Sequence, residues 1–449
     1  MNLRQITLLV SLLCLGCGSD PSQPTILTAE QAAHAELPLL SKSPHQGLQA
    51  ELSLVIQQCA TPGLLSRQSG ADQNAPRARL ASRTKVAKQQ ATIAGALNQA
   101  FPPISRPLVR GQIDEVYAGG PLSLSPIQLE RGRDLLRKHA EAIDRFRRAL
   151  AGDQSFGLPL ERGILVNLEF LEPLEVGCHL EAIAAADALA ENLPARAIPH
   201  LQVMLHAAQK LSLEMNITTR LAAANLRADA LFVLRAVAAH TRVTRDIHIE
   251  LLRLLETHAA DWPHDAQAWI GDRAAGLLIY ELVRDGQYLS LLPADEVKRL
   301  EEQKIVNVTG RAVMRNIDAD QLFYLRATRQ MIDACNRPYF ERTALLKQLR
   351  RDLTETEQTA DYPLVAATLL LDDFETAHRR QAEDLARFRA CQLALTAALD
   401  QPTDLLEQNP LTGRPYTLTH TPLAITITDI AREGITDDPP IELPILPAQ

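Results

Sequence analysis

Two long stretches of the chain contain neither proline nor glycine, and both repeat apolar residues at helical spacing. They cover residues 200–262 and 364–400. Apolar residues three and four positions apart fall on one side of a helix, so each stretch predicts helices that bury one face against a neighbour. In the first stretch this spacing is kept by Leu226, Ala230, Val233, Val237, Ile247, Leu251 and Leu254. We therefore predict a mainly α fold, either an irregular multi-helix bundle or a solenoid-like helical body.

Local signals predict where several helices begin. Residues 125–128 read Ser-Pro-Ile-Gln, a capping box with proline at the first helical position, and predict a helix to about Ala151. Pro263 is expected to start another helix, and Asp318 with Gln321 to cap the next one. The stretch 364–400 predicts one unbroken helix.

The composition changes after residue 401, where eight prolines fall in the final 48 residues and residues 423–428 alternate like a strand. We predict four segments. They are a signal peptide over 1–18, a tether with N-terminal helical pieces over 19–124, a helical body over 125–400, and a small Pro-rich β/turn module over 401–449.

The first residues have the pattern of a leader for export. Arg4 is followed by a short apolar run over residues 6–15 and then by the small residues Gly16, Gly18 and Ser19. No later run approaches the length of apolar sequence that a membrane span needs. We therefore expect a chain that is globular once the leader is removed.

Residues 14–17, Cys-Leu-Gly-Cys, resemble the lipobox of bacterial lipoproteins. The resemblance implies cleavage before Cys17 and attachment of lipid to it. Gly18 is not the aspartate that retains family members at the inner membrane, so the resemblance implies an outer-membrane or periplasmic lipoprotein. Cys14 stands where the family usually has Leu, Val or Ile, and the alternative is plain secretion after cleavage near Gly18.

Residues 409–416 read Asn-Pro-Leu-Thr-Gly-Arg-Pro-Tyr and precede the predicted strand and a Gly-x-x-Asp-Asp turn. This ending resembles a C-terminal pattern of uncharacterised exported bacterial proteins of planctomycete type. It is also similar to the ending of type II secretion pseudopilins, in which acidic residues hold calcium. That resemblance implies Asp429, Asp437 and Asp438 as candidate metal ligands. The alternative is structural, because proline followed by glycine favours a tight turn into a hairpin.

The densest group of polar and aromatic residues lies in residues 261–286, which contain both tryptophans, Trp262 and Trp269. On a helix these residues would fall on neighbouring turns, which suits a pocket in a hydrolase or a small-ligand-binding protein. The structural alternative is that the tryptophans anchor helix packing, while Gly271 and Gly276 let helices approach closely. The candidate catalytic or binding residues are Asp265, Asp272, Arg273 and Glu281.

Other chemistry-bearing residues predict structural roles. Glu375 and His378 have the helical spacing of metal ligands, but di-iron bundles need this motif twice and the chain has it once. Cys178 and His179 are adjacent and would point in different directions on a helix. We expect His200 and His206, six positions apart, to be ordinary histidines.

Four cysteines lie beyond the leader, at Cys59, Cys178, Cys335 and Cys391. An oxidising compartment would permit two disulfides with three possible connectivities. The alternative is four buried free thiols that pack as small apolar residues.

Residues 76–113 contain no acidic residue and several arginines and lysines, including Arg106 and Arg110. Such a segment suits contact with anionic headgroups or envelope polymers. The alternative is a helix face balanced by acids elsewhere in the fold.

The sequence lacks a Gly-x-Ser-x-Gly elbow, a His-Glu-x-x-His motif, a phosphate loop and a dinucleotide fingerprint. We therefore predict no cofactor. The net charge of −8 and the absence of aromatic residues interleaved with the basic segment argue against nucleic acid as a partner. The prediction is a non-enzymatic cell-envelope lipoprotein, held at the membrane by its lipid and presenting a helical scaffold to an envelope protein or polymer. The alternative is a periplasmic or surface hydrolase or small-ligand-binding protein that uses residues 261–286.

Overall fold

The chain was analysed as a computed structural model that describes residues 93–117, 124–152, 156, 158, 168–292, 294–303, 306–360, 363–403, 408–430 and 439–446. Within these ranges it is mainly helical, with a small three-stranded sheet near the C-terminal end, which confirms the predicted fold class. The leader with Cys14 and Cys17, the cysteine at Cys59, and Asp437 and Asp438 lie outside the described residues.

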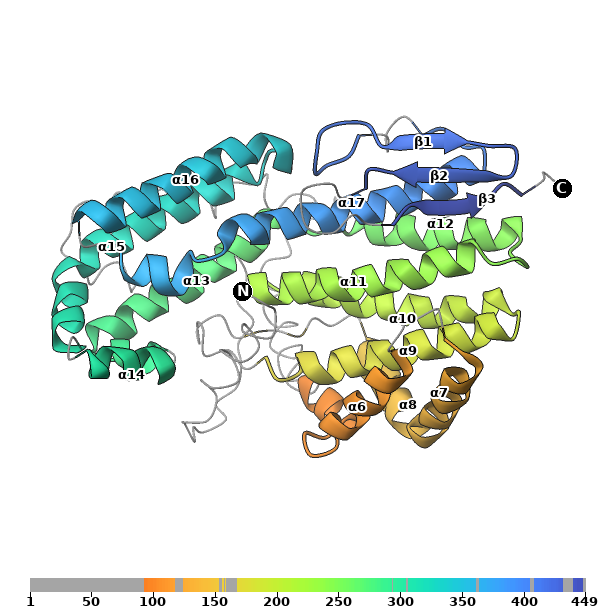
Figure 1. The fold of residues 1–449 in the computed structure, drawn as a ribbon, viewed down its shortest axis with the longest axis horizontal. Coiled ribbons are helices and arrows are strands. Elements are labelled where there is room, and N and C mark those ends of the chain that lie inside the picture. The colour runs from red at the N-terminus through yellow and green to blue at the C-terminus, as the bar shows by residue number, and fades with distance from the viewer. Residues whose placement is uncertain are drawn as a thin grey trace, which may run out of the picture.

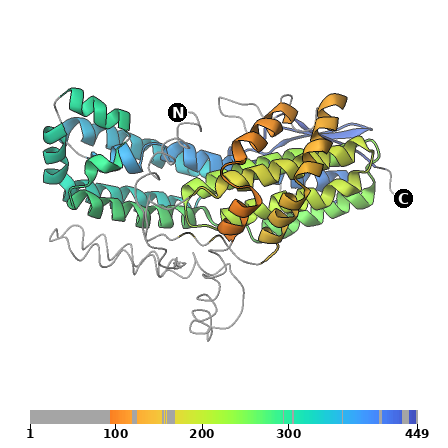
Figure 2. The same cartoon turned by 90° about the horizontal axis from the view of Figure 1, so that it is seen from below.

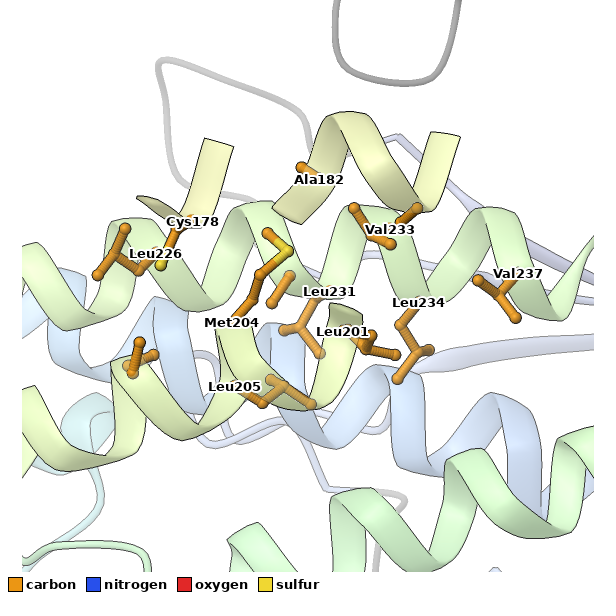
Figure 3. Packing of buried hydrophobic residues seen from close by; sticks show 14 of the residues in the cluster. Cys178, Ala182, Leu201, Met204, Leu205, Leu226, Leu231, Val233, Leu234 and Val237 are labelled. Atoms are coloured by element: carbon orange, nitrogen blue, oxygen red, sulfur yellow. The ribbon is translucent and has the colours of Figure 1, made fainter. Parts of the chain in front are cut away.

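The first group of helices forms one half of an elongated body (Figure 1). It comprises α6 (Arg106–Tyr117), α7 (Pro126–Lys138), α8 (Ala140–Leu150), α9 (Leu171–Ala190), α10 (Pro194–Ser212), α11 (Ile217–Ala238) and α12 (Arg245–Ala260). Helix α10 packs against both α9 and α11. Cys178, Met204 and Leu226, one from each of these helices, meet in the buried core between them (Figure 3).

The second group forms the opposite half of the body, as two perpendicular views show (Figures 1 and 2). It comprises α13 (Asp265–Arg284), the short 3₁₀ turn η2 (Tyr288–Leu291), α14 (Ala294–Glu302), α15 (Val306–Ala334) and α16 (Tyr339–Ala360). Helices α13 and α15 pack along each other, and their apolar faces build a second hydrophobic cluster.

The last helix, α17 (Phe374–Ala398), connects the two halves. Its first part, including Phe374 and Ala382, belongs to the second cluster, whereas Phe388 and Leu395 belong to the first. Because the helix is buried along most of its length in both clusters, it ties the two halves into one body.

The sheet lies over the second half of α17 (Figure 1). Strands β1 (Thr417–His420), β2 (Ala424–Thr428) and β3 (Ile441–Pro444) are antiparallel in the order β1-β2-β3. Ile425 pairs with Leu443, and both point into the first hydrophobic cluster, as expected for a strand with alternate residues buried. The sheet therefore shares its core with the helices.

The structure confirms some predicted element boundaries. The Ser125 side chain caps α7, and Gln128 completes the capping box. The predicted strand is β2, whose isoleucines are buried while their neighbours are partly exposed. The turn before it is confirmed too, since Gly413 has a φ of 71° and donates its N–H to Asn409 O over 2.8 Å.

Three predicted boundaries are wrong. The helix expected to reach Ala151 breaks at His139 into α7 and α8. Asp318 and Gln321 lie inside α15, where both accept hydrogen bonds from Arg284 at the end of α13.

The helix expected over 364–400 is interrupted by a π-helical turn, η3 (Ala366–Leu370), before α17 begins. The start of this turn is held by Asp320 of α15. Its carboxylate accepts from the backbone N–H of Leu364, from that of Val365 at 2.8 Å and from that of Ala366 at 3.0 Å. Three consecutive N–H groups are thus held by a neighbouring helix, which caps a new helical start here.

Candidate functional site

Asp265 stands at the start of α13 and joins this helix to α16. Its carboxylate lies 2.8 Å from Nη1 of Arg342. Arg342 is buried and also donates to the carbonyl oxygens of Arg337, at 2.6 Å, and Cys335, at 3.3 Å. This arginine therefore holds the start of α13 to the turn between α15 and α16.

Asp272 joins α13 to the start of α11. Its Oδ1 accepts from the backbone N–H of Ile217 over 3.0 Å. The carboxylate is poorly hydrated because protein atoms crowd around it, and this desolvation raises its pKa to about 7. The contact requires close helix approach. A Cβ on Gly271 would lie 1.7 Å from the carbonyl oxygen of Met215, which confirms the packing role predicted for this glycine.

Arg273 and Glu281 are the other two candidate residues of α13, and their contacts differ from those of Asp265 and Asp272. Arg273 has no exposed surface. Glu281 accepts from Arg284 over 3.0 Å, and the same arginine reaches Asp318 on α15. Asp265, Asp272 and Glu281 thus accept hydrogen bonds from three different parts of the chain, so the predicted set is not brought to one shared partner.

Both tryptophans take part in helix packing, as the structural interpretation predicted. Trp269 stacks on His378 of α17, with ring centroids 4.5 Å apart, and donates to Gln381 over 3.3 Å. Trp262 packs against Phe388 and beneath the guanidinium of Arg227. They connect α13 and the turn before it to α17.

The predicted metal spacing at Glu375 and His378 does not bring the two side chains together. Glu375 pairs with Arg350 over 3.1 Å, whereas His378 has no exposed surface. The pKa of His378 is lowered to about 3, mainly by burial. The positive charge of Arg342 lowers this pKa further, and the negative charge of Asp265 opposes the shift only in part. In the described part of the chain, no group of three or more potential ligands could hold a metal ion.

A second buried charge pair joins α11 to α17. Arg227 and Asp384 are both almost fully buried and form a direct ion pair. Burial raises the pKa of Asp384, and the facing Arg227 and Arg220 counteract this. Breaking such a pair leaves one charge buried alone, so it specifies how α11 and α17 are aligned.

One polar cluster was not predicted, at the junction of α8, α9 and α10. Glu181 is fully buried and accepts from Arg147 at 2.6 and 2.8 Å, and its Oε2 lies 2.6 Å from Nδ1 of His200. Burial opposes ionisation of Glu181, but the hydrogen bonds from His200 and Arg147 outweigh burial and lower its pKa. No local motif connects these three residues in the sequence. The only signal was a glutamate inside the otherwise apolar buried face of α9.

The described cysteines are free and buried, at Cys178, Cys335 and Cys391. Burial raises the pKa of the Cys178 and Cys335 thiols, so they remain protonated and pack as small apolar groups. These three cysteines therefore fit the alternative in which the thiols are free and buried and form no disulfides.

The described arginines of the basic segment face protein carboxylates. Arg106 is buried and pairs with Glu172 over 3.1 Å, and Arg110 lies 3.6 Å from Glu175. These two residues fit the alternative in which acids elsewhere in the fold balance the segment.

The residues of the C-terminal motif line an open pocket next to α16. Its lining includes Tyr339, Phe340 and Thr343 of α16, Thr412 and Arg414 of the turn, and Asp429. The pocket volume is about 600 Å³. Asp429 accepts from the hydroxyl of Thr417 over 2.7 Å. Its two predicted companions, Asp437 and Asp438, lie outside the described residues.

Comparison of the chain with protein-family models, with curated proteins and with solved structures gives no match. None of the helices in the described ranges has the length and apolar content that crossing a bilayer requires.

Proposed function

We propose that this chain is an exported cell-envelope lipoprotein, anchored through Cys17, whose helical body binds an envelope protein or polymer and catalyses no reaction. The observation that carries the proposal concerns the candidate catalytic residues of α13. Asp265 and Asp272 hold α13 to α16 and α11, and Arg273 has no exposed surface. Groups used in this way connect helices and are not presented to a substrate.

The arrangement of the helices supports the same role. Buried ion pairs and hydrogen bonds, such as Arg227 with Asp384 and Asp320 with the start of η3, fix one relative position of the helices. A rigid elongated body presents its surface in one fixed shape, which lowers the entropy cost of binding a large partner.

The anchor is supported by the leader pattern and by the lipobox resemblance at residues 14–17. The test uses the full chain expressed in a bacterial host with a lipoprotein pathway. Intact mass of the membrane fraction is expected to give a chain that begins at Cys17 and carries acyl groups. Cys17→Ser should remove this mass and move the folded protein out of the membrane fraction.

Cys14→Ser is the matched control, since Cys14 precedes the expected cleavage point and would be removed with the leader. This variant should keep the lipidated mass. An unlipidated mass that begins near Ser19 in the native protein would overturn the anchor and favour plain secretion.

A further inference from the structure

The start of α6 carries an apolar patch on the surface of the molecule. Over residues 102–108 every exposed residue is apolar, and these residues are Pro102, Pro103, Ile104, Pro107 and Leu108. Ile104 is 97% exposed and Leu108 is 62% exposed. Contiguous exposed apolar surface marks a contact with a membrane or another protein, whereas single exposed apolar residues need no explanation. These five residues, the 102–108 patch, are therefore a candidate contact surface.

The turn that presents the patch is firmly built from the inside. The carbonyl of Pro102 accepts from the N–H groups of Ser105, at 3.0 Å, and Arg106, at 3.1 Å. The guanidinium of the buried Arg106 donates to the carbonyl of Phe101 over 2.7 Å and to the side chain of Asn98 over 2.6 Å. Phe101 itself is buried in the first hydrophobic cluster. The apolar residues between these two inward-facing side chains are thus held at the surface before any partner arrives.

The patch lies on an outer side of the body. Helix α6 lies with α7 and α8 on the side of the first half that is away from the sheet (Figure 1). The view turned toward that side shows α6 on the near face of the molecule (Figure 2). The patch is therefore accessible to a surface much larger than a pocket ligand.

The charge of the preceding sequence favours a bilayer as that surface. Residues 76–113 contain no aspartate or glutamate. Arg106 and Arg110 face protein carboxylates, so the attraction rests on the basic residues before them, which are Arg77, Arg79, Arg83, Lys85 and Lys88. Exposed apolar residues next to basic ones bind the interface of anionic bilayers, because burial of apolar area and attraction to the headgroups add. An apolar protein partner would not account for the run without acidic residues.

We propose that the 102–108 patch inserts into the interface of an anionic bilayer and holds the α6 side of the body against it. This rests on the proposed function in one respect, since lipid on Cys17 keeps the chain at the same membrane. The patch alone gives a weak and reversible contact, because it offers far less apolar surface than an acyl chain. Together the two contacts orient the body, with the sheet away from the membrane.

Vesicle sedimentation measures the contact without the lipid anchor. The full chain with Cys17→Ser is mixed with phosphatidylglycerol-containing vesicles at millimolar lipid, since so weak a contact is lost on dilution. Ile104→Ser combined with Leu108→Ser should weaken binding at least about tenfold, the fold-change expected when two apolar side chains are lost from the interface. Leu423→Ser removes an 81% exposed leucine between β1 and β2 and should leave binding unchanged. All variants share the same N-terminal residues, so the contribution of those residues cancels.

The lipid composition separates the two contributions. Phosphatidylcholine vesicles carry no net charge, so they should bind the Cys17→Ser protein several-fold more weakly than phosphatidylglycerol-containing vesicles do. The serine substitutions at residues 104 and 108 should weaken binding to both kinds of vesicle, because the apolar contribution does not depend on headgroup charge.

Fluorescence locates the patch in the bilayer directly. Ile104→Trp in the Cys17→Ser protein should shift its emission to the blue when phosphatidylglycerol-containing vesicles are added, and lipids with brominated acyl chains should quench it. Trp262 and Trp269 pack in the interior and give a constant background. Leu423→Trp is the matched control and should show neither change.

The proposal is overturned if the serine variant binds vesicles as well as its parent, or if vesicles leave the emission of Ile104→Trp unchanged. It is also overturned if the parent does not bind vesicles but self-associates in sedimentation velocity and the serine variant does not, because the patch would then join two copies. These outcomes leave the mass of the lipidated native chain unchanged. Conversely, an unlipidated native chain would overturn the anchor and leave vesicle binding of the Cys17→Ser protein unchanged.

Discussion

At the scale of single residues, His378 makes the stability of the folded protein depend on pH, although its side chain is completely buried. Its ring stacks on Trp269, and neither ring nitrogen has a hydrogen-bond partner in the described structure. The charged groups that face it are Arg342 and Asp265. A proton added to this ring would place an unpaired charge in the interior.

We expect His378 to make the protein sensitive to acid. Its pKa falls from an ordinary 6.5 to about 3 on folding, so between these values the unfolded chain binds a proton that the folded chain does not. Stability is complete above pH 6.5 and is lost as the pH falls, by about 1.4 kcal/mol per pH unit. His378→Phe keeps a stacked ring and removes the proton acceptor.

Urea unfolding of both proteins at pH 7.5 and pH 5 measures this effect. The native protein should lose about 2 kcal/mol more than His378→Phe between the two values. His258, whose pKa burial lowers to about 4, contributes equally to both proteins and cancels. Parallel loss of stability would show that His378 is not the responsible group.

At the scale of helices, close approach at a glycine sets the position of α13. The backbone turn before α11 lies against Gly271, with the Met215 carbonyl where a Cβ would be. Gly271→Ala should therefore lower the free energy of unfolding by about 3 kcal/mol or more, as overpacking against backbone does. Chemical denaturation followed by circular dichroism measures the loss.

Gly111→Ala is the matched control, because Gly111 lies inside α6 with no atom within 4 Å of an added Cβ. Alanine is the better helix former, so this variant should gain up to about 1 kcal/mol. Equal effects of the two substitutions would contradict the close approach at Gly271.

Sequence patterns predicted the elements whose causes are local. The capping box at residues 125–128 and the alternation in β2 both depend on residues a few positions apart, and both are confirmed. The cap at the start of η3 was missed because Asp320 is 44 positions or more from the N–H groups it holds. Glu181 with His200 was missed for the same reason, since neither residue has a local motif.

The contacts of the candidate site on α13 could not be predicted for the same reason, because they join residues that are distant in the sequence. Helical spacing suggested that residues 261–286 fall on neighbouring turns and could form one pocket, with Asp265, Asp272, Arg273 and Glu281 as candidate catalytic or binding residues. In the fold, Asp265, Asp272 and Glu281 each have a different partner. The structural alternative for the motif at 409–416, a tight turn, is confirmed. The position of this turn next to α16 depends on contacts across the whole fold.

At the scale of the whole molecule, α17 couples the two hydrophobic clusters. Phe388 is buried in the first cluster, and earlier residues of the same helix are buried in the second. Phe388→Ala should cost about 3 to 5 kcal/mol. Native-state hydrogen exchange should show that amides of α10 and α15 lose protection together.

Leu423→Ala serves as the control, since Leu423 is 81% exposed and its loss should change stability by less than about 0.5 kcal/mol. Protection in α15 that stays at the native level in Phe388→Ala would mean that the two halves unfold independently.

The position of α17 and the sheet near the end of the chain has a consequence for biosynthesis. Helices α11 and α12 are made well before α17 and the sheet, so the parts of their apolar faces that contact α17, and for α11 also β3, stay uncovered until residues 374–398 and 441–444 have been synthesised. Contacts between such distant parts of a sequence form late and slow folding. A nascent chain of this kind stays unfolded for longer, which is the state in which a polypeptide can still be threaded through a narrow channel or engaged by a chaperone.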